Sequence, residues 1–151
     1  MKNLFLSLLS LILPLCCFSQ EINLKKMDET TRNEYLIKLA HEVTKKFGPG
    51  YYRQDSKPII TKHIFQTQYK DELYTKNIGR EYYTVTFPYD KKEELFETDY
   101  TSQVEIWEDT GEPYRAMFGN GYGIHFLITS YKEWIEIGIE EDEKVQYQQV
   151  K

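Results

Sequence analysis

The order of the hydrophobic patterns constrains the fold of this chain more than any other feature. One helical pattern comes first, because Leu36, Leu39, Val43 and Phe47 recur at the spacing that gives a helix an apolar stripe. The segments that follow alternate apolar and polar residues, as strands with one buried face do. A helix with a single apolar stripe has to cover another element. This order therefore predicts a helix lying on a sheet.

The helix is predicted over residues 28–47. Thr31 and Glu34 are one candidate capping pair at its start, and Asp28 is an alternative N-cap. The run Gly48-Pro49-Gly50 predicts its end. Glycine can take the left-handed cap conformation there, and proline cannot continue the helix.

Six later segments carry strand-type patterns. The predicted strands are residues 58–69, 81–89, 100–108, 113–118, 124–129 and 134–140. Short connections between the later segments favour antiparallel neighbours. The predicted fold class is α+β, with one N-terminal helix packed on a curved antiparallel sheet of about five or six strands. It forms a single domain over residues 20–151, with an acidic C-terminal tail at residues 140–144.

Alternation also predicts which strand residues share a face. Tyr114, Ala116 and Phe118 are expected on one side of their strand. In the last strand Trp134 is expected to face outward, and the inward residues are Ile135, Ile137 and Ile139. The charged segment 90–99 is predicted to be a loop or a single helical turn.

The amino terminus has the pattern of a secretory signal peptide. Lys2 precedes an apolar run over residues 4–15, which is too short to span a membrane, and small residues follow. Cleavage after Ser19 is expected, which makes residues 1–19 the signal and the mature protein periplasmic or extracellular. Alternatively, Cys17 or Cys16 carries a lipid anchor. The segment 17–20 resembles the exit sequences of secreted bacterial proteins.

Composition argues against several functions. A net charge of −5 with scattered basic pairs disfavours a nucleic-acid partner. The spacing of His41, His63 and His125 does not suggest a metal site, and His125 is expected to be a half-exposed structural residue on the other face of the sheet. The glycine cluster at residues 119–123 precedes a strand pattern, so it predicts a hairpin and no phosphate loop. No cofactor, metal or transmembrane segment of the mature chain is expected.

Three carboxylates near one predicted hairpin could support acid-base chemistry. Two of Glu105, Glu108 and Glu112 would have to converge in a cleft for the protein to act as a carboxylate-dependent hydrolase. Their positions at a turn and on an outward strand face predict solvent exposure. A hydrolase is therefore the third function considered, and the chain is not expected to be an enzyme.

The aromatic content indicates binding, since the chain has 13 tyrosines and 2 tryptophans. Tyr82, Trp107, Tyr122 and Trp134 fall at positions predicted to be outward or in loops, and such residues are enriched at protein interfaces. They predict a secreted or periplasmic, non-enzymatic protein-binding domain of an inhibitor-like or immunity-like kind. Trp107→Ala is then expected to change stability by less than about 1 kcal/mol. The alternative is a small-ligand carrier whose helix and sheet enclose an aromatic-lined pocket.

The hairpin over residues 104–113 contains the run Asp109-Thr110-Gly111-Glu112. With the preceding helix that ends at glycine, this motif resembles the PepSY domain over residues 36–118. Small exported members of that family are thought to modulate peptidases or to bind protein partners. The resemblance therefore implies a protein or peptide partner for this chain.

Overall fold

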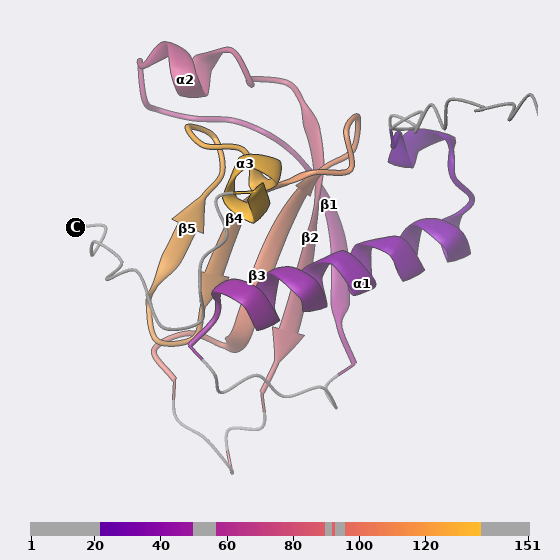
Figure 1. The fold of residues 1–151 in the computed structure, drawn as a ribbon, viewed down its shortest axis with the longest axis vertical. Coiled ribbons are helices and arrows are strands. Elements are labelled where there is room, and N and C mark those ends of the chain that lie inside the picture. Colours follow the sequence, from indigo (N-terminus) through magenta and orange to yellow (C-terminus); the bar gives the residue numbers. More distant parts are fainter. Residues whose placement is uncertain (1–21, 50–56, 90–91, 93–95, 137–151) are drawn as a thin grey trace, which may run out of the picture.

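The computed structural model describes residues 22–49, 57–89, 92 and 96–136. In this part of the chain a long helix lies on a five-stranded antiparallel sheet (Figure 1), which confirms the α+β prediction. The elements in chain order are η1 Leu24–Lys26, α1 Glu29–Phe47, β1 Ile59–Ile64, α2 Glu72–Thr75, β2 Glu81–Pro88, β3 Tyr100–Trp107, β4 Pro113–Phe118, β5 Gly123–His125 and α3 Tyr131–Glu136. The predicted signal peptide, both cysteines, the acidic tail and part of the 90–99 segment lie outside the described residues.

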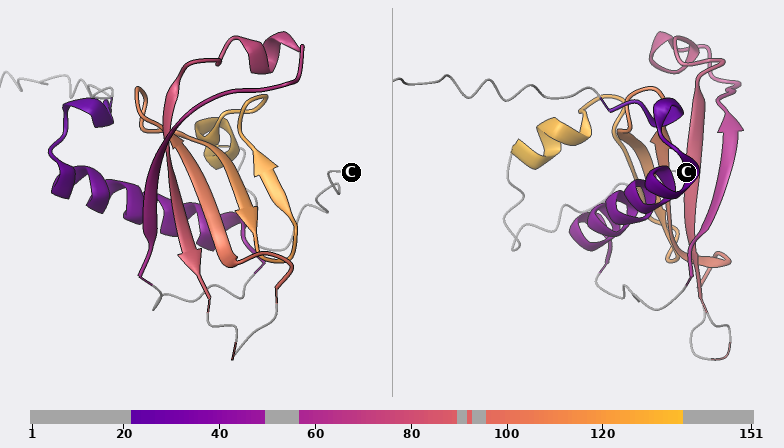
Figure 2. Two further views of the ribbon diagram at one scale, coloured as in Figure 1. Left: turned by 180° about the vertical axis from the view of Figure 1, so that it is seen from behind. Right: turned by 90° about the vertical axis from the view of Figure 1, so that its right-hand side faces the viewer.

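The sheet is a meander in which each strand pairs with the next one in the sequence. The order is β1-β2-β3-β4-β5 and every pairing is antiparallel, so β1 and β5 are its edges. Helices α1 and α3 lie on one side of the sheet, as the right view of Figure 2 shows. We call this side the inner face and the opposite side the outer face.

Helix α1 begins at the residue predicted as the alternative cap. Asp28 accepts hydrogen bonds from the Thr31 backbone N–H at 3.0 Å and from the Thr31 hydroxyl at 2.7 Å, so Thr31 lies inside the first turn. The helix ends at Gly48, whose N–H donates to the Thr44 carbonyl at 2.8 Å. Gly48 has φ −78° and ψ 159°, so it does not form the left-handed cap expected of glycine, and Gly50 lies outside the described residues.

The inner face holds the main hydrophobic core. Val85, Phe87, Val104 and Ile106 of the central strands are fully buried and pack with the apolar stripe of α1. The period-two prediction for these strands is confirmed. Each such side chain contributes about 1.5 to 3 kcal/mol by leaving water, as an upper estimate.

The strand predicted over residues 134–140 is wrong where the structure describes it. Ser130 and Glu133 form a reciprocal capping box, with Ser130 N–H donating to the Glu133 carboxylate at 2.7 Å and Glu133 N–H to the Ser130 hydroxyl at 3.2 Å. This pair starts helix α3, which overrides the isoleucine alternation. Trp134 consequently packs edge-on against Phe47, and Ile135 is 40% exposed. Residues 137 and 139 lie outside the described part of the chain.

Candidate functional site

Glu105 and Glu108 are buried, contrary to the expectation that they face solvent. Glu105 lies within β3 and Glu108 directly follows its last residue, and their side chains contact different neighbours. Glu108 accepts hydrogen bonds from the Tyr83 hydroxyl at 3.1 Å and forms a 2.8 Å ion pair with Lys62. Burial by itself raises the pKa of Glu108, but the hydrogen bonds from Lys62 and other neighbours outweigh it and lower that pKa below its usual value.

Glu105 instead forms an ion pair with Arg115 on the neighbouring strand β4. Glu112 forms a separate ion pair with the Lys132 ammonium, at 2.6 Å. Each carboxylate thus has its own cation, and the three do not form a cleft. The hydrolase alternative required two of them to converge as a catalytic pair, and this arrangement does not meet that condition.

Trp107 is only 5% exposed, so the prediction of an exposed tryptophan on a hairpin is wrong. Its ring stacks on Tyr114 at a centroid distance of 4.0 Å and contacts the edge of Phe65 at 5.5 Å. These three residues form a second buried group, which we call the outer cluster. Trp107 therefore points away from α1, to the outer face, and a different part of the chain covers it there.

The guanidinium of Arg80 covers the remaining side of this tryptophan, 4.0 Å from the ring centroid. Arg80 also donates to Asp109 through Nε at 3.1 Å and Nη2 at 2.7 Å. Two residues later, Gly111 has φ +65°, and a Cβ there would lie 2.5 Å from Ile22. Asp109 and Gly111, from the run Asp109-Thr110-Gly111-Glu112, thus stabilise the turn between β3 and β4.

A β-bulge places Tyr114 in the outer cluster. Glu105 pairs with Arg115 and Ile106 pairs with Pro113, so Tyr114 is the extra residue on β4. Ala116 and Phe118 belong to the inner core, whereas the Tyr114 ring lies on the outer face. The prediction that these three residues share one side is wrong because alternation alone cannot show a bulge.

The chain between β1 and β2, residues 65–80, crosses the outer face and contains α2 (Figures 1 and 2). We call this segment the roof. Its two ends are joined by hydrogen bonds from Phe65 N–H to the Arg80 carbonyl at 2.8 Å and from Gly79 N–H to the Phe65 carbonyl at 3.0 Å. Gly79 has φ +87°, a conformation that favours glycine. Asp71 caps α2 by accepting from Leu73 N–H at 2.8 Å.

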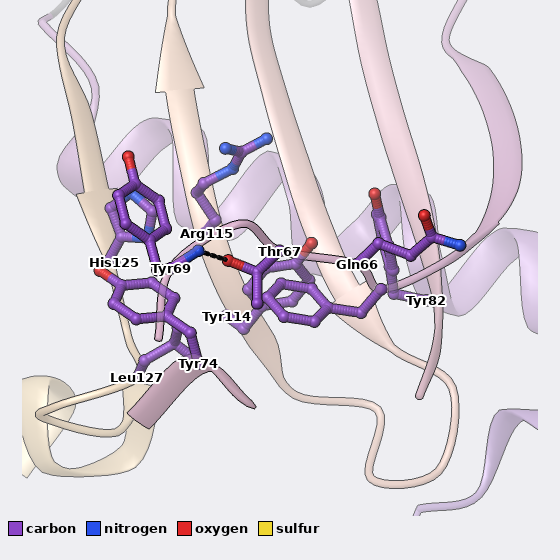
Figure 3. A pocket seen from close by; sticks show the side chains of 10 residues that line it. Gln66, Thr67, Tyr69, Tyr74, Tyr82, Tyr114, Arg115, His125 and Leu127 are labelled. Atoms are coloured by element: carbon purple, nitrogen blue, oxygen red, sulfur yellow. Dashed lines mark hydrogen bonds between the residues drawn. The ribbon is translucent and has the colours of Figure 1, made fainter. Parts of the chain in front are cut away.

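A pocket of about 160 Å³ lies between the roof and the outer face (Figure 3). Aromatic side chains form most of its wall. Its lining residues are Phe65, Gln66, Thr67, Tyr69, Tyr74, Tyr82, Tyr114, Arg115, His125 and Leu127. The ligand-carrier prediction placed an aromatic pocket between helix and sheet, but this one is on the face opposite to α1. We call it the roofed pocket.

Arg115 brings a charge to this largely aromatic wall. Its Nε donates to Glu105 at 2.6 Å and its Nη2 donates to the other oxygen of the same carboxylate. Burial raises the pKa of Tyr114, and the neighbouring Glu105 carboxylate raises it further. Glu105 is thus neutralised and hydrogen-bonded by Arg115 next to the pocket, without lining it.

His125 lies directly opposite Arg115 in the pairing of β5 with β4. Burial lowers the pKa of His125, and the positive charge of Arg115 lowers it further. Its Nδ1 atom is buried and has no hydrogen-bond partner among the described residues. At neutral pH the pocket therefore presents a neutral imidazole beside a cation, on the outer face where His125 was expected.

The four aromatic residues predicted as a partner-binding set do not form one surface. Tyr82 lines the roofed pocket and Trp107 is buried in the outer cluster beside it. Tyr122 is 38% exposed in the β4–β5 turn, and Trp134 packs on the inner side against the end of α1. Only Tyr82 of this set is a lining residue of the pocket.

Several pocket residues were not predicted from the sequence, above all Arg115, Tyr74 and Tyr69. One signal was available for Arg115, because it and Glu105 stand at nearly equal distances on either side of the Asp109-Thr110-Gly111-Glu112 turn. Opposite charges placed so are typical of cross-strand pairs. The roof tyrosines gave no such signal, since their position depends on how a 16-residue segment folds back.

The glycine cluster at residues 119–123 is a hairpin turn, as predicted. Gly121 has φ +81°, and the Phe118 N–H donates to the Tyr122 carbonyl at 2.7 Å between β4 and β5. The segment leads into the short strand β5, and no helix N-terminus follows it directly. Its glycines therefore provide the turn conformation.

Comparisons of the chain with protein-family models, with curated proteins and with solved structures found no match. The PepSY resemblance stays a prediction based on the hairpin and the helix-sheet order. Within the described ranges, no helix combines the length and apolar character needed to cross a membrane. Those same ranges contain no group of three or more His, Cys, Asp or Glu residues placed to hold a metal ion.

Proposed function

We propose that this protein is a non-enzymatic binding domain that holds a small aromatic group in the roofed pocket. The observation that carries the proposal is a cavity of about 160 Å³ whose wall is mostly aromatic and contains one arginine. An engineered cavity of roughly 150 Å³ is large enough for benzene. The roofed pocket thus has the size for one aromatic ring.

The wall chemistry also suits a ring. Tyr82 and Tyr114 approach each other edge to face at 5.3 Å, and Tyr69 and Tyr74 lie 5.1 Å apart in the roof. Aromatic pairs of this kind contribute about 0.5 to 1.5 kcal/mol beyond simple burial. A ring bound between the two pairs would extend the same packing.

The ring can belong to a free small molecule or to a side chain of a protein partner. With either source the protein is a binding domain, as the aromatic content predicts. The signal-peptide pattern supports the proposal that binding takes place outside the cytoplasm, after removal of residues 1–19. The PepSY resemblance favours a peptide as the source of the ring.

The test is a titration of the purified protein with phenol and, separately, with N-acetyltyrosinamide, followed by backbone amide NMR. We expect saturable shifts at Leu127, His125 and the roof, and little change in the β4–β5 turn. Stronger binding of the amide would identify a peptide as the source. No saturable shift with either probe would contradict the proposal.

Two tyrosine variants provide a matched control. Tyr74→Ala removes part of the wall and is expected to weaken phenol binding by about fivefold. Tyr122→Ala removes a tyrosine outside the pocket and is expected to leave binding at the wild-type value. Equal losses in the two variants would place the binding elsewhere.

A further inference from the structure

The charge of the roofed pocket is asymmetric. Of the described residues that line it, Arg115 is ionised at neutral pH, and none carries a carboxylate. Glu105, which compensates this charge, is almost fully buried and is not a lining residue. A ligand in the pocket would therefore contact the Arg115 side chain, whereas the Glu105 carboxylate does not line the pocket.

The hydrogen-bonding capacity of Arg115 is only partly used. Its Nε and Nη2 atoms donate to Glu105, and Nη1 has no acceptor among the residues that the structure describes. The side chain is 35% exposed, whereas that of Glu105 is 5% exposed. The guanidinium is thus fixed in place by the buried carboxylate, and this residue, which lines the pocket, retains Nη1 as a donor without an acceptor among the described residues.

We infer that the aromatic ligand carries a carboxylate, which accepts a charge-assisted hydrogen bond from Nη1 of Arg115 while its ring occupies the pocket. This inference rests on the proposed function and specifies its ligand class. The small cavity volume leaves room for one ring inside. The carboxylate then stays near the half-exposed guanidinium, where its desolvation cost is low.

Two sources offer this chemistry: a free aromatic acid and a C-terminal aromatic residue of a peptide. Phenylacetate represents the first and N-acetylphenylalanine the second. Phenylacetamide has nearly the same shape as phenylacetate but no charge, so it isolates the effect of the carboxylate. All three are titrated against the purified protein by amide NMR or calorimetry.

We expect phenylacetate to bind about tenfold or more tightly than phenylacetamide, as a hydrogen bond to a charged partner allows. The preference should shrink at high salt, because Arg115 is partly exposed. Tighter binding of N-acetylphenylalanine than of phenylacetate would identify a peptide terminus as the source. Equal binding of phenylacetate and phenylacetamide would overturn this inference and leave the proposed function standing, whereas no binding of any probe would overturn both.

A double variant that carries both Glu105→Gln and Arg115→Gln tests the role of Arg115. Changing both residues avoids a buried carboxylate without its cation. The preference for phenylacetate over phenylacetamide should fall to about one. The matched control is the pair Glu112→Gln and Lys132→Gln, an ion pair outside the pocket, which should keep the wild-type preference. A persistent preference in the first pair would overturn the role of Arg115.

Discussion

The two faces of the sheet are covered by different parts of the chain and packed with different side chains. Helix α1 covers the inner face, where the buried strand residues are mainly aliphatic or phenylalanine, such as Val85 and Phe87. The roof covers part of the outer face, where Trp107 and Tyr114 pack beside the ion pair between the buried Glu105 and the half-exposed Arg115. The inner face is a hydrophobic core, and the outer face combines packing with polar groups that line the roofed pocket.

This difference shows how the covering segment decides whether a face of this sheet keeps a pocket. A face covered by a helix through close apolar packing leaves little room for a ligand. A face covered by a connection of 16 residues, fixed at its two ends and by Arg80, retains a pocket. The following substitutions test that contrast, beginning with the largest expected effect.

Phe87→Ala should destabilise the protein by about 3 to 5 kcal/mol, because it empties a large volume in the inner core. Phe87 is fully buried there. Urea unfolding followed by circular dichroism measures the loss. A cost below about 1 kcal/mol would contradict the assignment of the inner face as the main core.

Trp107→Ala should cost about 3 kcal/mol, because the indole is buried between Tyr114 and Arg80. The same unfolding measurement applies. This expectation replaces the small effect predicted from the sequence alone. A change of less than about 1 kcal/mol would mean that the outer cluster is not packed and that Trp107 is a surface residue after all.

Gly79→Ala should cost about 1 to 2 kcal/mol, because an alanine is strained at φ +87°. Gly79→Asn is the matched control, since asparagine tolerates this conformation better, and its cost should be smaller. Both are measured by thermal unfolding, together with the affinity for phenol. Equal costs for the two substitutions would show that the roof does not hold this turn.

The smallest effect concerns pH. His125 has a pKa below its ordinary value of 6.5 in the folded protein, mainly through burial and then through Arg115. Just below pH 6.5 the unfolded chain therefore binds more protons than the folded protein. The free energy of unfolding consequently falls as the pH decreases from 6.5 towards the lower pKa of His125 in the folded protein.

Urea unfolding between pH 7 and pH 5 measures this dependence. His125→Gln should flatten the curve, because glutamine has no proton to gain. An unchanged slope in the variant would show that His125 is as solvated in the folded protein as in the unfolded chain.

Much of the inner face could be predicted from the sequence, because its signals are local. The stripe through Leu36 and Val43 defined α1, and alternation through Val85 and Val104 defined the buried side of β2 and β3. The carboxyl-terminal segment forms a helix where isoleucine alternation predicted a strand, because the capping pair of Ser130 and Glu133 starts a helix there.

The outer face was predicted poorly because its arrangement is not local. Trp107 was assigned to the correct side of β3, but nothing near it in the sequence shows that residues 65–80 cover it. Tyr114 reaches that side through a one-residue bulge, which reverses the expected alternation. The pocket arises from these two features together, so no single sequence motif contains its residues.

The central claim is that the space beneath the roof binds an aromatic ring, and filling that space tests it most directly. Leu127 lines the pocket, so Leu127→Trp should occupy it, whereas Leu127→Val keeps it open. Phenol affinity is measured by amide NMR for both variants. The account predicts saturable binding by the valine variant and none by a folded tryptophan variant. Wild-type phenol affinity in the tryptophan variant would contradict it.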